Sequence, residues 1–356
     1  MTGVQTCALP ISVNDQAVGA VGTANTYIGI FIIMFSVISS GMVAVMTQNI
    51  GAGRPGVAYQ ARQLGLVFNA ALGVIMSLFL SLGAGTILSG VGVADALMQP
   101  AKTYLQIVGG FCILNALIPI CSSYLRAFGF SKEPLYASII GNVINFCLNA
   151  FFLFVLHKGV AGVATATVIS RIINLVIVVL LGAVLVKAKQ HPERESNRAV
   201  MGQIIRIGLP SACETAIYNV SMTLVIRFLN QMDAQGLNVT ARSYTMQITN
   251  FSYCVGAALA QANAIMTGWH IGAKEYDACD RGTKKAAVIG VIVAVILETV
   301  FTLCSGWIMQ LFSKDPQMVS LVGKLLAIDI VLEIGRVTNL VYGQALKTSG
   351  DAVFPV

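Results

Sequence analysis

The chain has 356 residues, of which 56% are hydrophobic and 10% are charged, and its formal net charge is +7. Soluble domains carry roughly 25% charged residues, so a water-soluble fold could not cover this much apolar surface. Long stretches hold no charged residue at all, for example those between Asp15 and Arg54 and between Arg242 and Lys274. They exceed the roughly 20 residues of a spanning helix and far exceed a barrel strand. The composition predicts an all-α polytopic membrane protein embedded in a lipid bilayer.

Nine spans are predicted in chain order, at about 20–46, 63–90, 103–125, 135–156, 160–186, 207–230, 240–267, 286–311 and 319–346. The third span contains Gly109, Gly110 and Pro119. These residues make the span bendable, although proline is also tolerated passively in membrane helices.

The loops between the spans alternate in charge. One set holds fourteen Lys and Arg residues, whereas the other holds only Lys102, Lys158 and Lys314. The positive-inside rule places the basic set in the cytoplasm, which predicts a multi-pass protein of the plasma (inner) membrane. The positive charge is therefore a topology signal, and no nucleic-acid partner is expected. The longest basic loop, 187–206, is predicted to be a cytoplasmic linker between two bundles, 12–186 and 207–356.

Two motifs recur along the chain with the same offset. Asn49-Ile50-Gly51-Ala52 returns as His270-Ile271-Gly272-Ala273, and Leu125-Arg126-Ala127-Phe128-Gly129 returns as Leu346-Lys347-Thr348-Ser349-Gly350. The residue numbers of the two copies differ by 221 each time. The copies lie on the same side of the membrane, so the repeats run parallel. Internal duplication of this kind is typical of transporters in which two halves rock about a central site.

The offset also bears on the ends of the chain. The partner of the span at 207–230 would precede residue 12, but residues 1–11 resemble neither a helix nor a signal peptide. They read as one frame of a sequencing adapter, so we expect 1–11 to be an artefact. The second copy ends before the two spans that follow Pro134 in the first copy. The nine spans are thus expected to be nine of twelve, without the first and the last two.

Several motifs in a fixed order resemble the multidrug and toxic compound extrusion (MATE) family. They are Gln48-Asn49-Ile50-Gly51-Ala52-Gly53, the Leu125–Gly129 run before Pro134, Gly208-Leu209-Pro210, and Leu332-Glu333-Ile334-Gly335-Arg336 leading to Gly350-Asp351. The resemblance implies two pseudo-symmetric six-helix bundles that alternate between inward-open and outward-open states. It implies antiport of cationic, amphiphilic drugs or toxins against sodium ions or protons by a monomer without a cofactor.

The last span contains the densest group of ionisable residues. Asp329, Glu333 and Arg336 stand at i, i+4 and i+7 on one helical face, which Asn339 extends. One interpretation is a Glu333–Arg336 ion pair that fixes helix packing. The other is functional: two carboxylates and one guanidinium leave one negative charge for a sodium ion, a proton or a cationic drug. Asp329 is then the better coupling residue, because Glu333 is the nearer partner of Arg336.

A second acidic candidate opens the sixth span. Glu214 lies four residues after Pro210, close to Tyr218 and Asn219. The family resemblance implies that an acid on this helix lines the cavity, although its shallow position would also let it reach interfacial water. A sodium ion is expected at Asp329 or Glu214, and no other metal site is predicted.

Amide side chains mark two further helices. Asn142, Asn145 and Asn149 form one stripe of the fourth span, and Gln247 and Asn250 make the seventh span polar. Each group is expected either to bond neighbouring helices or to line a wet cavity. Three charged residues, Arg171, Arg227 and Glu298, are expected near the membrane interface or in structural roles.

Two alternatives remain at this point. A lipid-linked-oligosaccharide flippase would need several cationic side chains in its cavity, whereas here the acids inside the spans match the arginines in number. A membrane protein of another function, such as an enzyme, would need a catalytic cluster, but no HExxH or Walker A motif occurs. The sequence therefore predicts a transporter and not an enzyme.

Overall fold

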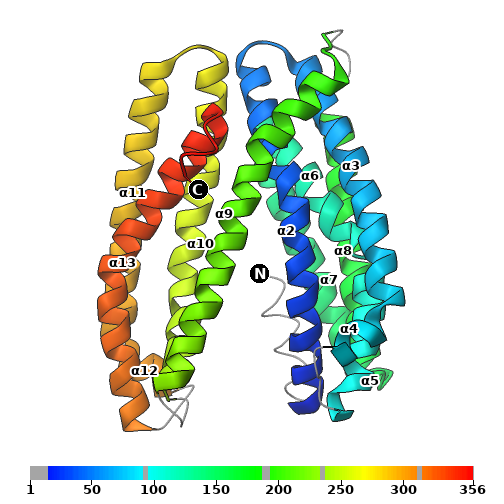
Figure 1. Cartoon of the computed structure of the whole chain (residues 1–356), viewed down its shortest axis with the longest axis vertical. Coiled ribbons are helices and arrows are strands. Elements are labelled where there is room, and N and C mark those ends of the chain that lie inside the picture. The colour runs from blue at the N-terminus through cyan, green and yellow to red at the C-terminus, as the bar shows by residue number, and fades with distance from the viewer. Residues whose placement is uncertain (1–14, 91–94, 187–192, 233–236, 311–314, 356) are drawn as a thin grey trace. The chain divides into compact units, whose positions relative to one another are not determined.

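The computed structural model describes residues 15–90, 95–186, 193–232, 237–310 and 315–355, which form helices and short connections without any strand. The all-α fold is therefore confirmed for these ranges (Figure 1). The expected artefact at 1–11 lies outside the described residues, as does the first part of the expected linker.

The chain divides into two compact units. Unit 1 comprises Met1–Met46 and Arg54–Leu209, and unit 2 comprises Thr47–Gly53 and Pro210–Val356. The first helices are α2 (Asp15–Gly51), α3 (Pro55–Leu82), α4 (Ala84–Gly90), α5 (Asp95–Tyr104), α6 (Ile113–Ala127), α7 (Lys132–Ala150) and α8 (Gly159–Leu185). Those that follow are α9 (Asn197–Met232), α10 (Leu237–Gly272), α11 (Tyr276–Leu303), α12 (Ser305–Gln310) and α13 (Pro316–Ser349). The unit boundaries fall inside α2 and α9, and α9 begins within the range expected to be linker.

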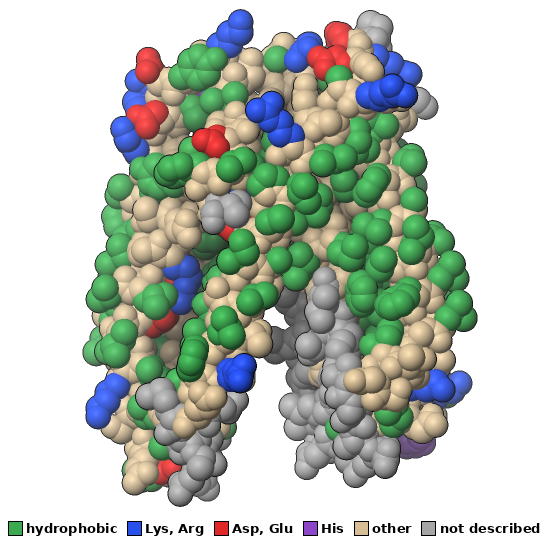
Figure 2. Space-filling view, in the orientation of Figure 1, with side chains coloured by type: hydrophobic (Ala, Val, Ile, Leu, Met, Phe, Trp, Pro, Cys, Tyr) green, Lys and Arg blue, Asp and Glu red, His purple; other side chains and the backbone are tan. Residues whose placement is uncertain are grey.

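Five helices among the described residues are long and apolar enough to cross a membrane, and the bent pair Leu97–Gly109 and Ile113–Ala127 makes a sixth. Three further helices, α9, α10 and α13, have 36, 36 and 34 residues and more polar side chains. At 1.5 Å per residue each exceeds the roughly 30 Å of the hydrocarbon layer. Figure 2 shows broad hydrophobic surfaces, with charged side chains concentrated toward helix ends. These helix lengths and surfaces are those of a polytopic membrane protein.

The internal repeat is confirmed in the backbone. Helices α3 and α11 both contain 28 residues and start at corresponding positions. Left-handed residues precede them at Gly53 (φ 72°) and Lys274 (φ 62°), and the corresponding Gly129 (φ 88°) and Gly350 (φ 108°) follow α6 and α13. Left-handed backbone angles are rare outside glycine, and Lys274 adopts one where the first copy has Gly53, so the repeat is structural and not only a similarity of short motifs.

The two copies differ in one helix. In unit 2, α13 runs unbroken from Pro316 to Ser349, whereas the matching part of unit 1 consists of α5, a π-helical turn over Leu105–Gly109, and α6. The chain bends by 43° there, at Gly109 and Gly110, whereas Pro119 lies inside α6 beyond the break. The freed backbone N–H of Ile113 donates to Ser77 Oγ at 3.1 Å. A neighbouring hydroxyl thus satisfies a donor that the break leaves without a helical partner.

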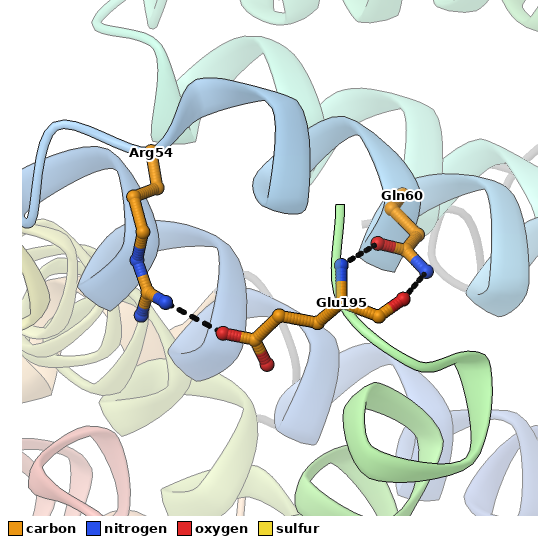
Figure 3. A network of polar contacts seen from close by, with 3 residues as sticks. All are labelled: Arg54, Gln60 and Glu195. Carbon is orange, nitrogen blue, oxygen red and sulfur yellow. Dashed lines mark hydrogen bonds and ion pairs between the residues drawn. The ribbon is translucent and has the colours of Figure 1, made fainter. Parts of the chain in front are cut away.

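The segment before α9 is fixed to unit 1 by a polar network (Figure 3). Arg54 Nη1 lies 2.5 Å from Glu195 Oε1, and the Glu195 N–H donates to Gln60 Oε1 at 3.0 Å. The Gln60 amide donates in turn to the Glu195 carbonyl (2.7 Å) and to Asn197 Oδ1 (2.6 Å). The side chain of Gln60 therefore ties the start of α9 to α3.

Helices α2 and α9 pack within unit 1 through two glycines. A Cβ atom at Gly41 would overlap the Ile204 carbonyl, and one at Gly208 would overlap the Val37 carbonyl. We expect Gly208→Ala to destabilise the protein by about 1–3 kcal/mol, because the helices must separate to admit the methyl group. Thermal unfolding of the purified protein measures the change.

The same helix provides a control. Gly202 of α9 has no atom within 4 Å of a built Cβ, so Gly202→Ala should unfold at or slightly above the wild-type temperature, since alanine favours the helix. Equal unfolding temperatures for the two alanine variants would show that the close helix contact at Gly208 does not contribute to stability.

Candidate functional site in unit 2

The charged residues of α13 form a connected cluster. Arg336 Nη1 lies 2.8 Å from Glu333 Oε2, and Arg336 Nη2 donates to Asp329 Oδ1 at 3.3 Å. The spacing of three and seven residues brings both carboxylates to one guanidinium. Glu333 is the nearer partner, as the sequence predicted. The second oxygen of Asp329, Oδ2, is buried and accepts no hydrogen bond from the described residues.

Asp329 and Arg336 face a cavity of about 570 Å³ between α9, α10 and α13. Two other predicted residues, Tyr218 and Asn339, also line it. Most of the remaining wall is apolar and comes from Met222, Leu229, Met246, Leu321, Leu325, Ile328 and Leu332. This volume is typical of small-molecule sites. Methionines add flexible, polarisable surface that adapts to ligands of different shape.

The cavity also holds polar residues that sequence reasoning missed, namely Asn238, Arg242, Thr245 and Thr249 of α10. Their spacing follows one face of a helix, a signal that the sequence offered. The guanidinium of Arg242 contacts Met222 Sδ at 3.1 Å. The described part of the cavity wall therefore carries two guanidinium groups and one carboxylate.

Glu333 does not line the cavity. Its side chain is completely buried, as is that of Glu298 on α11. The hydroxyl of Ser252, likewise inaccessible to solvent, lies beside both carboxyl groups. Neither Glu298 oxygen accepts a hydrogen bond from the described residues. Of the two expectations for Glu298, exposure at the membrane interface or a structural role, full burial favours the second, because α11 packs against α10 and α13 around this side chain.

Glu214 is placed elsewhere in unit 2. It forms an ion pair with Lys347 in the last turn of α13, and it is not among the residues that line the cavity. The sequence assigned Lys347 to a loop, so this partner could not be foreseen. Glu214 therefore has a cationic partner of its own, as Asp329 has in Arg336.

The predicted amide stripes have mainly packing contacts. In unit 1, Asn145 Nδ2 donates to Ser170 Oγ at 3.3 Å and Asn149 Nδ2 donates to Asn145 Oδ1 at 3.1 Å, while Asn142 is half-buried. The Asn145–Ser170 bond joins α7 to α8, as interhelical bonding predicts, whereas the Asn149–Asn145 bond lies within α7.

The other predicted polar residues lie in unit 2 outside the cavity. Asn219 is exposed and donates to the Thr215 carbonyl of its own helix at 2.9 Å. Gln247 and Asn250 are exposed on α10. Among the described residues, no group of three or more His, Cys, Asp and Glu is arranged to hold a metal ion.

Known proteins share the sequence and the architecture of this chain. The model of the MatE family matches residues 7–151 and 210–356, once for each repeat. The uncharacterized transporter YisQ of Bacillus subtilis is 31% identical over 96% of this chain and 76% of its own length. The probable multidrug resistance protein NorM of Streptococcus pneumoniae is 23% identical over 96% of this chain and 77% of its own length.

Solved structures agree on the fold. A crystal structure of the MATE transporter VcmN of Vibrio cholerae superposes with a TM-score of 0.88 at 17% identity, over 99% of this chain and 80% of that one. An outward-facing multidrug resistance MATE family transporter gives a TM-score of 0.89 at 16% identity, over 99% and 79%. The two matches to one family model, together with the relative at 31% identity, show that this chain belongs to the MatE family.

Proposed function

We propose that this protein is a secondary active antiporter that exports cationic, amphiphilic drugs or toxins in exchange for sodium ions or protons. Asp329 Oδ2, a buried carboxylate oxygen in the cavity wall without a donor among the described residues, carries the proposal. A charged group in an apolar site requires neutralisation, and Arg336 is shared with Glu333. An ion or a cationic ligand would compensate the part of the Asp329 charge that Arg336 does not neutralise.

The wall of the cavity supports the class of substrate. Its many methionine and leucine side chains suit flat or irregular hydrophobic bodies, and the Asp329 carboxylate suits a positively charged group. The names of relatives such as NorM, a probable multidrug resistance protein, support the same class. We infer a monomer in the plasma (inner) membrane with its basic loops in the cytoplasm, without a cofactor or catalytic activity.

One observation favours the alternative of a flippase for lipids with anionic head groups. Arg242 and Arg336 both line the cavity, and two guanidinium groups could hold a phosphate or pyrophosphate. Under this alternative, Arg242→Ala should abolish transport of a fluorescent anionic lipid while leaving a lipophilic cation unaffected.

The deciding experiment uses the purified protein in lipid vesicles. A fluorescent lipophilic cation is followed while a sodium gradient and a proton gradient are imposed separately. We expect one of the two gradients to drive transport of the cation across the vesicle membrane. Transport should stop when that gradient is dissipated. Cation transport that depends on neither gradient, or transport of anionic lipids alone, would contradict the antiport proposal.

A further inference from the structure

The completely buried residues Ser252, Glu298 and Glu333, which we call the acidic layer, form a second ionisable site behind the cavity. They come from three helices, α10, α11 and α13. An apolar cluster lies on each side of the layer. Ala241, Ile248 and Leu326 belong to one, and Ala260, Ala294 and Val337 to the other. The layer is therefore a polar interruption in an otherwise hydrophobic core.

The internal repeat shows that the fold itself does not require acids here. The positions of unit 1 that correspond to the acidic layer in the repeat hold Phe31, Ser77 and Cys112. Cys112 belongs to a continuous hydrophobic cluster, against which Phe31 packs. Neutral side chains thus fill the same three positions in the other copy of this architecture. The two glutamates of unit 2 need an explanation other than packing.

The surroundings of Glu298 do not neutralise it. The charged groups that face it among the described residues all come from α13, namely Asp329, Glu333 and Arg336, while α10 contributes the Ser252 hydroxyl. Tyr253 of α10 lies near Glu333 and Arg336. Arg336 already contacts Asp329 and Glu333, and no Lys, Arg or His in the described part of the chain forms an ion pair with Glu298, which has the Ser252 hydroxyl beside it. A charged carboxylate without a partner is costly in such a place.

We propose that Glu298 and Glu333 hold one proton between them, and that this pair is the proton-binding site of the exchanger. The proposal rests on the antiport function above and adds to it a site distinct from the cavity. With one shared proton the pair carries one negative charge, which Arg336 balances. Asp329 then remains as the uncompensated acid of this cluster and faces the cavity. Release of the proton leaves three carboxylates against the one guanidinium of Arg336, and uptake returns the cluster to two.

A proton suits the chemistry of this layer. Two carboxyl groups and a hydroxyl can share a proton by hydrogen bonding, and like-charged carboxyl groups in one site do not both ionise. Burial of the whole layer also keeps the proton from exchanging with water until the helices move.

Infrared spectroscopy of the purified protein tests the site directly, without substrate or gradient. We expect the carbonyl band of a protonated carboxylic acid at neutral pH, with a slow shift in D2O because both groups are inaccessible. Glu298→Gln should remove the band. Glu275→Gln, at an exposed acid beside His270, and Asp329→Asn should retain it. Absence of the band from the wild type, or its persistence in both Glu298→Gln and Glu333→Gln, would overturn the proposal.

Transport tests the role of this proton. Glu298→Gln should reduce proton-driven efflux at least about tenfold while the affinity for the fluorescent cation stays within about twofold. Unchanged proton-driven efflux would overturn the coupling role. If Glu298→Gln does not fold, Glu298→Ser provides the residue that unit 1 has at this position. A wild-type infrared band without any efflux would reject the antiport function and leave the proton site standing, so the two failures are distinguishable.

Discussion

Asp329→Asn should abolish ion-driven efflux while the protein still inserts into membranes and folds. The substitution keeps the shape of the side chain but removes the carboxylate that the described residues contribute to the cavity wall. Arg336 donates to Asp329 Oδ1 at 3.3 Å, and in the variant its charge is balanced by Glu333 alone. Charge-assisted contacts contribute about 1.5–3 kcal/mol, so we expect binding of a lipophilic cation to weaken roughly 10-fold to 100-fold as well.

Vesicle efflux and fluorescence binding measure the two effects of Asp329→Asn. Asp280→Asn is the matched control, because it makes the same change at an exposed acid that pairs with Lys284. It should transport like the wild type. Full gradient-driven efflux in Asp329→Asn would show that the Asp329 carboxylate is not required for coupling. A loss in Glu214→Gln instead would identify the Glu214–Lys347 ion pair as the coupling site.

Arg336→Ala should destabilise unit 2 by about 3–5 kcal/mol, because removing one partner leaves the other buried charges uncompensated. Glu333 is completely buried and Asp329 nearly so, and both depend on this guanidinium. The loss should appear as a lower unfolding temperature in detergent and a smaller yield of folded protein. Arg336→Lys should recover only part of it, since an ammonium cannot contact both carboxylates as a planar fork does.

A rescue distinguishes lost neutralisation from lost packing. Adding Asp329→Asn and Glu333→Gln to Arg336→Ala removes all three charges, and the triple variant should regain most of the lost stability. If it stays as unstable as Arg336→Ala, the arginine acts through the volume of its side chain. If Arg336→Ala alone unfolds like the wild type, the cluster does not hold buried charge.

Much of the architecture could be predicted because it depends on local properties of the chain. Long uncharged runs predict helices in a bilayer, since unpaired backbone is not stable there. The constant offset between the recurring motifs predicts the repeat, which the structure reproduces down to the left-handed Gly129 and Gly350. The positions of Asp329 and Arg336 on one face follow from helix periodicity, and so does their contact.

Other features depend on which helix lies opposite. Ser252 and Glu298 belong to different helices, so no spacing rule relates them, yet both lie in the acidic layer with Glu333. Arg242 reaches the cavity because α10 packs beside α13. Glu214 of α9 and Lys347 of α13 also belong to different helices, so no spacing rule predicts their ion pair.

The sequence by itself determined that the chain lies in a lipid bilayer, that it is helical, that it contains a duplication and that α13 has a charged face. Each of these follows from composition, from the recurring motifs or from contacts within one helix. Only the tertiary structure decided which of the acids is paired, which faces the cavity and which is sealed in the core. That distinction decides function here, because the free energy of a charge in a membrane protein depends on its neighbours in space, and those neighbours come from other helices.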